Sequence, residues 1–153
     1  MKVQNLITGS FLGVMLAISV GCSSTTPPSQ LKLDVTSGSN LNPNIFGRPS
    51  PVYVTVMQLK DPQTFNTADY FALEGQASQV LGSNLIAQKT ILVTPSFKNS
   101  VDLSIDPQTR YLGVVAAYDQ LDSAAWRTGL PINSDTDKLV MQVDANKVSL
   151  AKE

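Results

Sequence analysis

The chain has 153 residues, about one domain's length, and 42% of them are hydrophobic, which excludes an intrinsically disordered protein. Its formal net charge is −1 and its lysines and arginines are spread singly, which argues against nucleic-acid binding. Histidine is absent, so the commonest general base and metal ligand is missing. We therefore expect no enzyme activity, no metal and no cofactor. The single cysteine, Cys22, excludes an internal disulfide and a thiolate metal site.

The N-terminal segment has the pattern of an export signal. Lys2 is followed by an uncharged apolar run of 15 residues, shorter than the roughly 20 residues of a transmembrane helix. Small residues precede Cys22, and the boundary resembles a bacterial lipobox, although Ser19 stands where that pattern usually has leucine. On this resemblance residues 1–21 are a signal peptide and residues 22–30 are a lipidated N-terminus with a flexible tether.

The resemblance to a lipobox also implies a location. Cys22 would become the mature N-terminus and carry covalent lipid, and several acyl chains together hold a protein firmly in a bilayer. Ser23 follows it, and the acidic residue that commonly retains such lipoproteins in the inner membrane is missing. We therefore expect the periplasmic face of the outer membrane. An ordinary cleaved signal, or an uncleaved anchor with an incidental cysteine, is the alternative.

The remaining chain shows repeated β-strand patterns. Leu31, Leu33 and Val35 alternate with polar residues, as in a half-buried strand, and similar runs recur between turn-forming segments. Eight strands are expected, at residues 31–36, 52–59, 86–93, 101–105, 111–118, 126–132, 139–143 and 148–150. Short strands with frequent turns predict a mainly β protein, a two-sheet β-sandwich over residues 31–153.

Residues 61–82, between the second and third strands, change to a helical period. We expect Asn66 or Thr67 to cap a helix that begins near Asp69, because the side chains of these residues can accept backbone N–H groups. Gly75 is expected to break this helix and Gly82 to end it. The sequence thus predicts a small helical insertion in the sandwich.

Four segments, in order along the chain, resemble the TssJ (VasD/SciN-like) outer-membrane lipoproteins of type VI secretion systems. They are residues 42–44 with 47–59, residues 65–73, residues 111–118 and residues 126–127. The resemblance implies a transthyretin-like two-sheet sandwich with an added helical part. It also implies a structural role at the outer membrane, bound to the periplasmic C-terminal domain of TssM and, through it, to the TssL–TssM inner-membrane complex.

The resemblance points to the loop between the first two strands, residues 37–48, as the partner-binding site. A geometric argument agrees, because a seven-residue strand carries the chain about 23 Å from the tether. In an antiparallel meander the loops at residues 95–99, 119–125 and 144–146 lie beside it. The loop offers apolar side chains within a polar rim, the usual composition of an interface core. The predicted partner-binding residues are Leu41, Asn42, Pro43, Asn44, Ile45, Phe46 and Arg48.

Other interpretations remain open at this point. The apolar loop residues can instead fold back and plug the end of the sandwich. The alternative function is a periplasmic lipoprotein that binds a small ligand or an envelope polymer between the sandwich and the helical insertion. Asn133, Asp135 and Asp137 alternate as in a calcium loop, but Lys138 replaces the glycine that such a loop needs. A catalytic carboxylate pair, formed for example by Asp119 or Asp122, is not excluded by the sequence.

Overall fold

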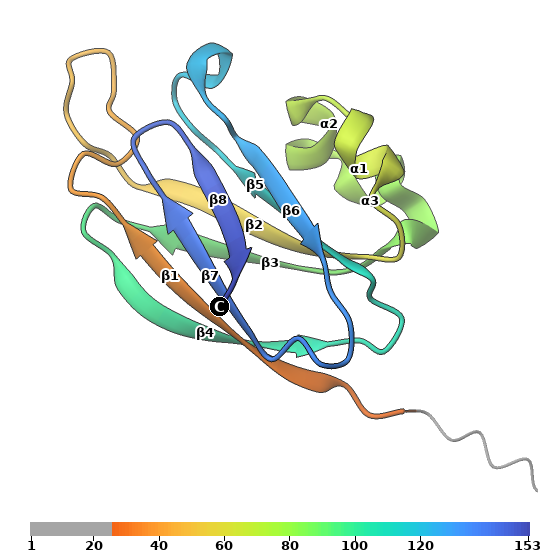
Figure 1. Cartoon of the computed structure of the whole chain (residues 1–153). Coiled ribbons are helices and arrows are strands. Elements are labelled where there is room, and N and C mark those ends of the chain that lie inside the picture. The colour runs from red at the N-terminus through yellow and green to blue at the C-terminus, as the bar shows by residue number, and fades with distance from the viewer. Residues whose placement is uncertain (1–25) are drawn as a thin grey trace, which may run out of the picture.

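The computed structural model describes residues 26–153, whose strands form two four-stranded sheets packed face to face (Figure 1). One sheet has the order β4-β1-β7-β8, formed by Lys98–Ile105, Ser29–Ser37, Lys138–Val143 and Val148–Lys152. The other has the order β3-β2-β5-β6, formed by Leu85–Val93, Val52–Leu59, Tyr111–Ala116 and Arg127–Pro131. The predicted two-sheet sandwich of eight strands is confirmed.

The direction of the strands decides which loops meet. β1 pairs antiparallel with β4 and parallel with β7, so the expected meander is wrong. Strand direction nevertheless alternates along the chain, and β1, β3, β5 and β7 all finish at one end of the sandwich. We call this end the distal end, and the opposite end, where β1 begins at Ser29, the tether end (Figure 1).

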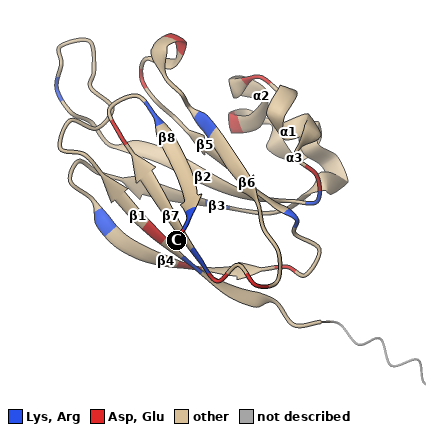
Figure 2. Ribbon diagram, viewed as in Figure 1, with Lys and Arg blue, Asp and Glu red and all other residues tan. Residues whose placement is uncertain are grey.

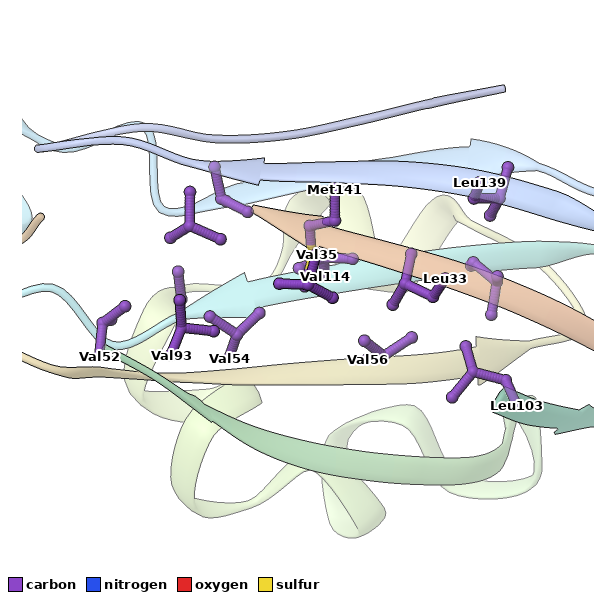
Figure 3. Packing of buried hydrophobic residues seen from close by; sticks show 14 of the residues in the cluster. Leu33, Val35, Val52, Val54, Val56, Val93, Leu103, Val114, Leu139 and Met141 are labelled. Atoms are coloured by element: carbon purple, nitrogen blue, oxygen red, sulfur yellow. The ribbon is translucent and has the colours of Figure 1, made fainter. Parts of the chain in front are cut away.

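Charged residues of both signs are spread over the strands and loops (Figure 2). Apolar side chains instead fill the space between the sheets (Figure 3), because alternate residues of each strand point inward. Leu31, Leu33 and Val35 are at most 1% exposed, as their alternation predicts. Val54, Val56 and Val114 face them from the other sheet, and Leu139 and Met141 of the neighbouring strand β7 belong to the same core.

The helical insertion consists of α1 (Gln63–Thr67), α2 (Tyr70–Gly75), α3 (Ala77–Leu81) and a 3₁₀ turn (Gly82–Asn84). It covers part of the outer face of the β3-β2-β5-β6 sheet, where Phe65, Leu73 and Leu81 pack with Met57 and Val115 in a second buried cluster. These helices are too short to be stable in isolation, so this packing holds them in place.

The start of the insertion differs from the prediction. Asp69, rather than Asn66 or Thr67, caps a helix, because its side chain accepts a hydrogen bond of 2.9 Å from the Ala72 N–H at the start of α2. Asn66 and Thr67 belong to α1, which the sequence did not predict. The predicted break at Gly75 is confirmed, since α2 ends there.

Arg127, at the start of β6, binds this insertion to the sheet through hydrogen bonds. Its guanidinium donates hydrogen bonds of 2.8 Å to the Phe65 carbonyl and 2.7 Å to the Ala68 carbonyl, both near the end of α1. It also lies 4.8 Å from the centre of the Trp126 ring, which in turn contacts Tyr70 edge to face. Trp126 and Arg127 therefore connect the insertion to the β3-β2-β5-β6 sheet.

Gly113 gives a first testable prediction. A Cβ at this position would lie 2.6 Å from the ring of Phe65, which is fully buried and has no room to move aside. We expect Gly113→Ala to destabilise the fold by about 1–3 kcal/mol, as overpacking in a core does. Chemical denaturation of the variant measures this. Gly75→Ala is the control, because a Cβ there meets nothing within 4 Å. Equal stability of the two variants would contradict the close packing of the Phe65 ring against Gly113.

Candidate functional site

The loop between β1 and β2, residues 38–51, lies at the distal end, and we call it the distal loop. Its first residues are fixed by backbone hydrogen bonds from Ser37 N to Phe97 O (2.9 Å) and from Gly38 N to Val143 O (3.4 Å). The nine residues of β1 separate it from the tether by about 26 Å. The loops after β3, β5 and β7 lie beside it, as the strand directions require.

Leu41 and Asn42 form the buried foot of the distal loop. The Asn42 amide donates to Ser50 Oγ (3.0 Å) and to the Pro51 carbonyl (3.1 Å), and its Oδ1 accepts from Asp119 N (2.9 Å). Leu41 is fully buried in the main core. The expectation that Leu41 is exposed for partner binding is therefore wrong. The hydrogen bonds of Asn42 hold this part of the loop against the sandwich.

The tip of the distal loop is a closed turn. Asn44 Oδ1 accepts hydrogen bonds from Phe46 N (3.0 Å) and Arg48 N (3.1 Å), and Gly47 N donates to the Asn44 carbonyl (2.8 Å). Gly47 has a φ of 72°, a conformation that glycine adopts without strain. Ile45 and Phe46 are 84% and 75% exposed. The turn therefore holds two large apolar side chains out from the surface.

The predicted site residues thus fall into two groups. Leu41 and Asn42 are buried, Pro43 and Asn44 are half-buried, and the exposed members are Ile45, Phe46 and Arg48. The plug interpretation holds for Leu41 alone. Singly exposed apolar residues are common on protein surfaces, whereas Ile45 and Phe46 are adjacent and are both exposed on one turn, so they are the strongest candidates for contact with another molecule.

Asn42 gives a second prediction. Replacing it by Ala removes three hydrogen bonds and leaves the Asp119 N–H and the Pro51 carbonyl without this partner. We expect a loss of about 1–3 kcal/mol of stability, the cost of a partly buried polar group left unpaired. Thermal or chemical denaturation measures it. Asn40→Ala is the control, because Asn40 is exposed. A variant as stable as the control contradicts this role of Asn42.

The β5–β6 loop, which the sequence placed beside the first loop, contributes residues that were not among the predicted partner-binding residues. It contains a short 3₁₀ turn, Leu121–Ser123, and its Gln120 amide donates 2.9 Å to the Pro43 carbonyl of the distal loop. Asp119 accepts a bond of 3.3 Å from Ser50. No local motif marks these residues, because only the strand order brings them to the distal loop.

Tyr118 is buried at the distal end. Tyr118 donates 3.2 Å to the Asp144 carbonyl, and burial, with a contribution from the Asp144 charge, raises the pKa of Tyr118 far above its ordinary value. It is therefore a neutral structural residue. Within residues 26–153, no group of three or more acidic, cysteine or histidine side chains is placed to hold a metal.

A hollow of about 160 Å³ lies where the alternative function expects a ligand, between α2 and the exposed half of the β3-β2-β5-β6 sheet. Its walls include Tyr53, Thr55, Glu74 and Gln88. Sites for small molecules usually enclose about 300–1,000 Å³. The hollow is smaller than that and therefore does not support the alternative ligand-binding function.

Comparison with known proteins decides the family. The model of the type VI secretion lipoprotein family described as VasD, EvfM and TssJ matches residues 29–147. The chain belongs to this family. The match spans β1 to β7 and ends directly before β8, and it confirms the resemblance that the four sequence segments carry.

Two solved structures of TssJ-like lipoproteins share the fold. The crystal structure of the type VI secretion lipoprotein TssJ1 from Pseudomonas aeruginosa is 34% identical with a TM-score of 0.79, covering 83% of this chain and 98% of that one. Lip of Serratia marcescens, a membrane-bound component of the type VI secretion system, is 25% identical with a TM-score of 0.75, covering 82% and 98%.

A third similar chain comes from a structure described as the C-terminal domain (869–1107) of the type VI secretion protein TssM from EAEC. It is 30% identical with a TM-score of 0.66, and the match covers 81% of this chain and 98% of that one. No curated protein matches the sequence. The comparisons therefore establish the TssJ family and its fold for this chain.

The predicted signal peptide, residues 1–21, and the lipidation site Cys22 lie outside the described residues. Among residues 26–153, none of the helices has the length and apolar character needed to cross a membrane. Thr26 and Pro27, near the start of the described residues, lie at the tether end. They line a hollow there together with the turns after β4 and β6. The predicted lipid attachment point is thus four residues from the end opposite the distal loop.

Proposed function

We propose that this protein is a lipid-anchored structural component of the type VI secretion membrane complex, and that it docks the periplasmic C-terminal domain of TssM through the distal loop. The observation that carries the proposal is the pair Ile45 and Phe46, held in solvent by a closed turn at the end far from the tether. Lipid on Cys22 would place that pair away from the membrane.

The rigidity of the tip supports docking. Because the Asn44 side chain and Gly47 close the turn, the backbone around Phe46 is already ordered before binding. A partner that covers Ile45 and Phe46 removes apolar surface from water without the additional cost of ordering the loop. Exposed Arg48 lies beside them and can donate to a partner carboxylate.

The comparison with the TssM structure supports this choice of partner. Residues 869–1107 span 239 residues, whereas the chain matched there is covered to 98% by about four-fifths of this 153-residue protein. The matched chain is therefore near the size of this domain and far shorter than the TssM domain. We infer that it is a TssJ-like companion of that domain.

The family and the sequence together support a location at a membrane. Members are secretion lipoproteins, and one similar protein is described as membrane bound. We propose the periplasmic face of the outer membrane, with TssM linking the protein to the TssL–TssM inner-membrane complex. A structural rather than catalytic role agrees with a chain that has no histidine and a single cysteine.

Affinity isolation tests the proposal. The full-length protein with a C-terminal tag is isolated from detergent-solubilised membranes, with untagged cells as the control. We expect TssM to be recovered with it, and TssL to follow through TssM. Recovery of the tagged protein without any inner-membrane partner, from cells that produce TssM, contradicts the proposed function.

A further inference from the structure

Two large, mainly apolar side chains lie exposed on the outer face of the β3-β2-β5-β6 sheet. Tyr53 of β2 is 60% exposed and Leu92 of β3 is 47% exposed, and the register of the two strands places them directly opposite each other. They point outward, because their neighbours Val52 and Val93 are buried in the main core. Since β2 begins and β3 ends at the distal end (Figure 1), this pair lies there, and we call it the outer pair.

The strand surface next to the outer pair is uncharged. The following cross-strand pair, Thr55 and Thr90, is joined by a hydrogen bond of 2.9 Å between the two hydroxyl groups. β2 contains no charged residue and is tan along its whole length in Figure 2. The outer face of the other sheet is different, because Lys32 and Asp34 alternate with the buried residues of β1, and Lys138 forms an ion pair with Asp34. Charged residues therefore cover the other sheet, but not these two cross-strand pairs.

Exposed residues connect the outer pair with the tip of the distal loop. From Ile45 to Tyr53 all residues are exposed except Ser50, which is half-buried, and Val52, which is buried. Tyr53 follows Phe46 by seven positions, so the two Cα atoms lie at most about 25 Å apart. A typical stable interface buries about 800 Å² on each partner, which corresponds to a patch roughly 30 Å across. The tip and the outer pair therefore fit within one interface.

The tip alone is too small for such an interface. Its exposed residues are residues 45–49, whereas a stable interface usually takes about 20–30 residues from each partner. A partner that binds the tip must therefore contact further surface at the distal end. Besides Ile45 and Phe46, the large apolar side chains exposed within residues 26–153 are those of Tyr53, Leu92 and Phe71. Phe71 belongs to α2, so the outer pair is the apolar surface that continues the tip at the distal end.

We propose that the protein that docks on Ile45 and Phe46 also covers the outer pair, Tyr53 and Leu92. The inference rests on the proposed function and deepens it, because it extends the contact surface from a loop onto a face of the sandwich. Covering the pair removes apolar surface from water, and pairing of the two strands has already ordered their backbone. The matching surface of the partner is expected to be apolar at its centre and polar toward Glu74, which lines the hollow beside Tyr53.

A double substitution measures the contribution of the outer pair. Tyr53→Thr with Leu92→Thr makes a second threonine pair beside Thr55 and Thr90, so side chains suited to a strand are kept. With the mature protein in detergent, we expect the Kd for the C-terminal domain of TssM to rise at least about tenfold, as the loss of apolar interface contacts does. Phe71→Ala, which removes an exposed ring from α2, is the control.

Site-specific photo-crosslinking tests the contact directly and does not depend on the stability of that variant. A photoreactive phenylalanine analogue is placed at position 53 of the full-length protein, in cells that produce TssM. We expect a cross-link to TssM, because the analogue keeps an aromatic ring at the outer pair. The same analogue at position 46 tests the proposed docking. At position 32 it is the control, because Lys32 is exposed on the other sheet.

The outcomes separate the two proposals. A cross-link to TssM from position 46 but not from position 53, or a double variant that binds as tightly as Phe71→Ala, contradicts the contact at the outer pair and leaves the proposed function intact. A cross-link from position 53 to a second copy of this chain, or equally strong cross-links from positions 53 and 32, also excludes TssM as its specific occupant. If neither position 46 nor position 53 gives a cross-link to TssM, the proposed function itself is contradicted.

Discussion

Replacing Phe46 by Asp is expected to weaken binding of the TssM domain by about 30- to 1,000-fold, or roughly 2–4 kcal/mol, as the loss of an interface hot spot does. The substitution removes an exposed ring and places a charge where the partner is to exclude water. The stability of the protein itself should change by less than about 0.5 kcal/mol, because the Phe46 side chain is 75% exposed. Calorimetric titration and thermal denaturation measure the two quantities.

Phe71→Asp is the matched control for this experiment. Phe71 is 72% exposed on α2, so the change in chemistry and in exposure is the same at a place away from the distal loop. If Phe71→Asp still binds the TssM domain while Phe46→Asp does not, the contact with TssM lies at the distal loop. Equal affinity of the two variants contradicts docking through the distal loop, and a large loss of stability in Phe46→Asp indicates that the ring instead supports the fold.

Replacing Cys22 by Ser is expected to abolish retention in the membrane. Each acyl CH₂ that enters the bilayer contributes about 0.8 kcal/mol, so removing the lipid removes nearly all of the affinity for the membrane. The variant should stay unprocessed or appear outside the detergent phase in a detergent-partition assay. Ser24→Ala, which keeps the cysteine, should partition like the unaltered protein. Unchanged retention of Cys22→Ser excludes the lipid anchor on this residue.

The strands were predictable from the sequence because their signal is local. Leu31, Leu33 and Val35 alternate with polar residues. Successive side chains of a strand point to opposite faces, so this alternation places all three apolar side chains on the same, buried face. All eight strands occur where they were expected, with ends that differ by a few residues. The pairing of β1 with β7 was not predictable, because it joins segments about 100 residues apart.

The helical insertion was predicted in position but not in detail. α1 begins after Asp61 and Pro62, and the Asp61 side chain accepts a hydrogen bond from the Gln63 N–H, but the helix has only five residues, too few to show a helical period in the sequence. It is held by Phe65 against Gly113 and by the bonds from Arg127, contacts that come from strands much later in the chain. Short helices that depend on such long-range contacts cannot be predicted from the local sequence pattern.

The sequence identified the loop that contains the candidate site, but it did not distinguish the buried residues of that loop from the exposed ones. Leu41 is buried while Ile45 and Phe46 are exposed, although all three are apolar residues of one segment. The difference arises from Asn42, whose side chain bonds Asp119, 77 positions later. The polar pocket beside Asn42 is still less visible in the sequence, since its lining comes from three loops that meet only in the folded sandwich.

Hydrogen–deuterium exchange of the mature protein, alone and saturated with the C-terminal domain of TssM, tests the central claim most directly. The account predicts slower exchange on binding in residues 38–51 and 117–126 at the distal end, with no change in residues 106–110 and 132–137 at the tether end. Protection that appears only at the tether end, or a saturated complex in which residues 38–51 exchange as before, would contradict docking through the distal loop.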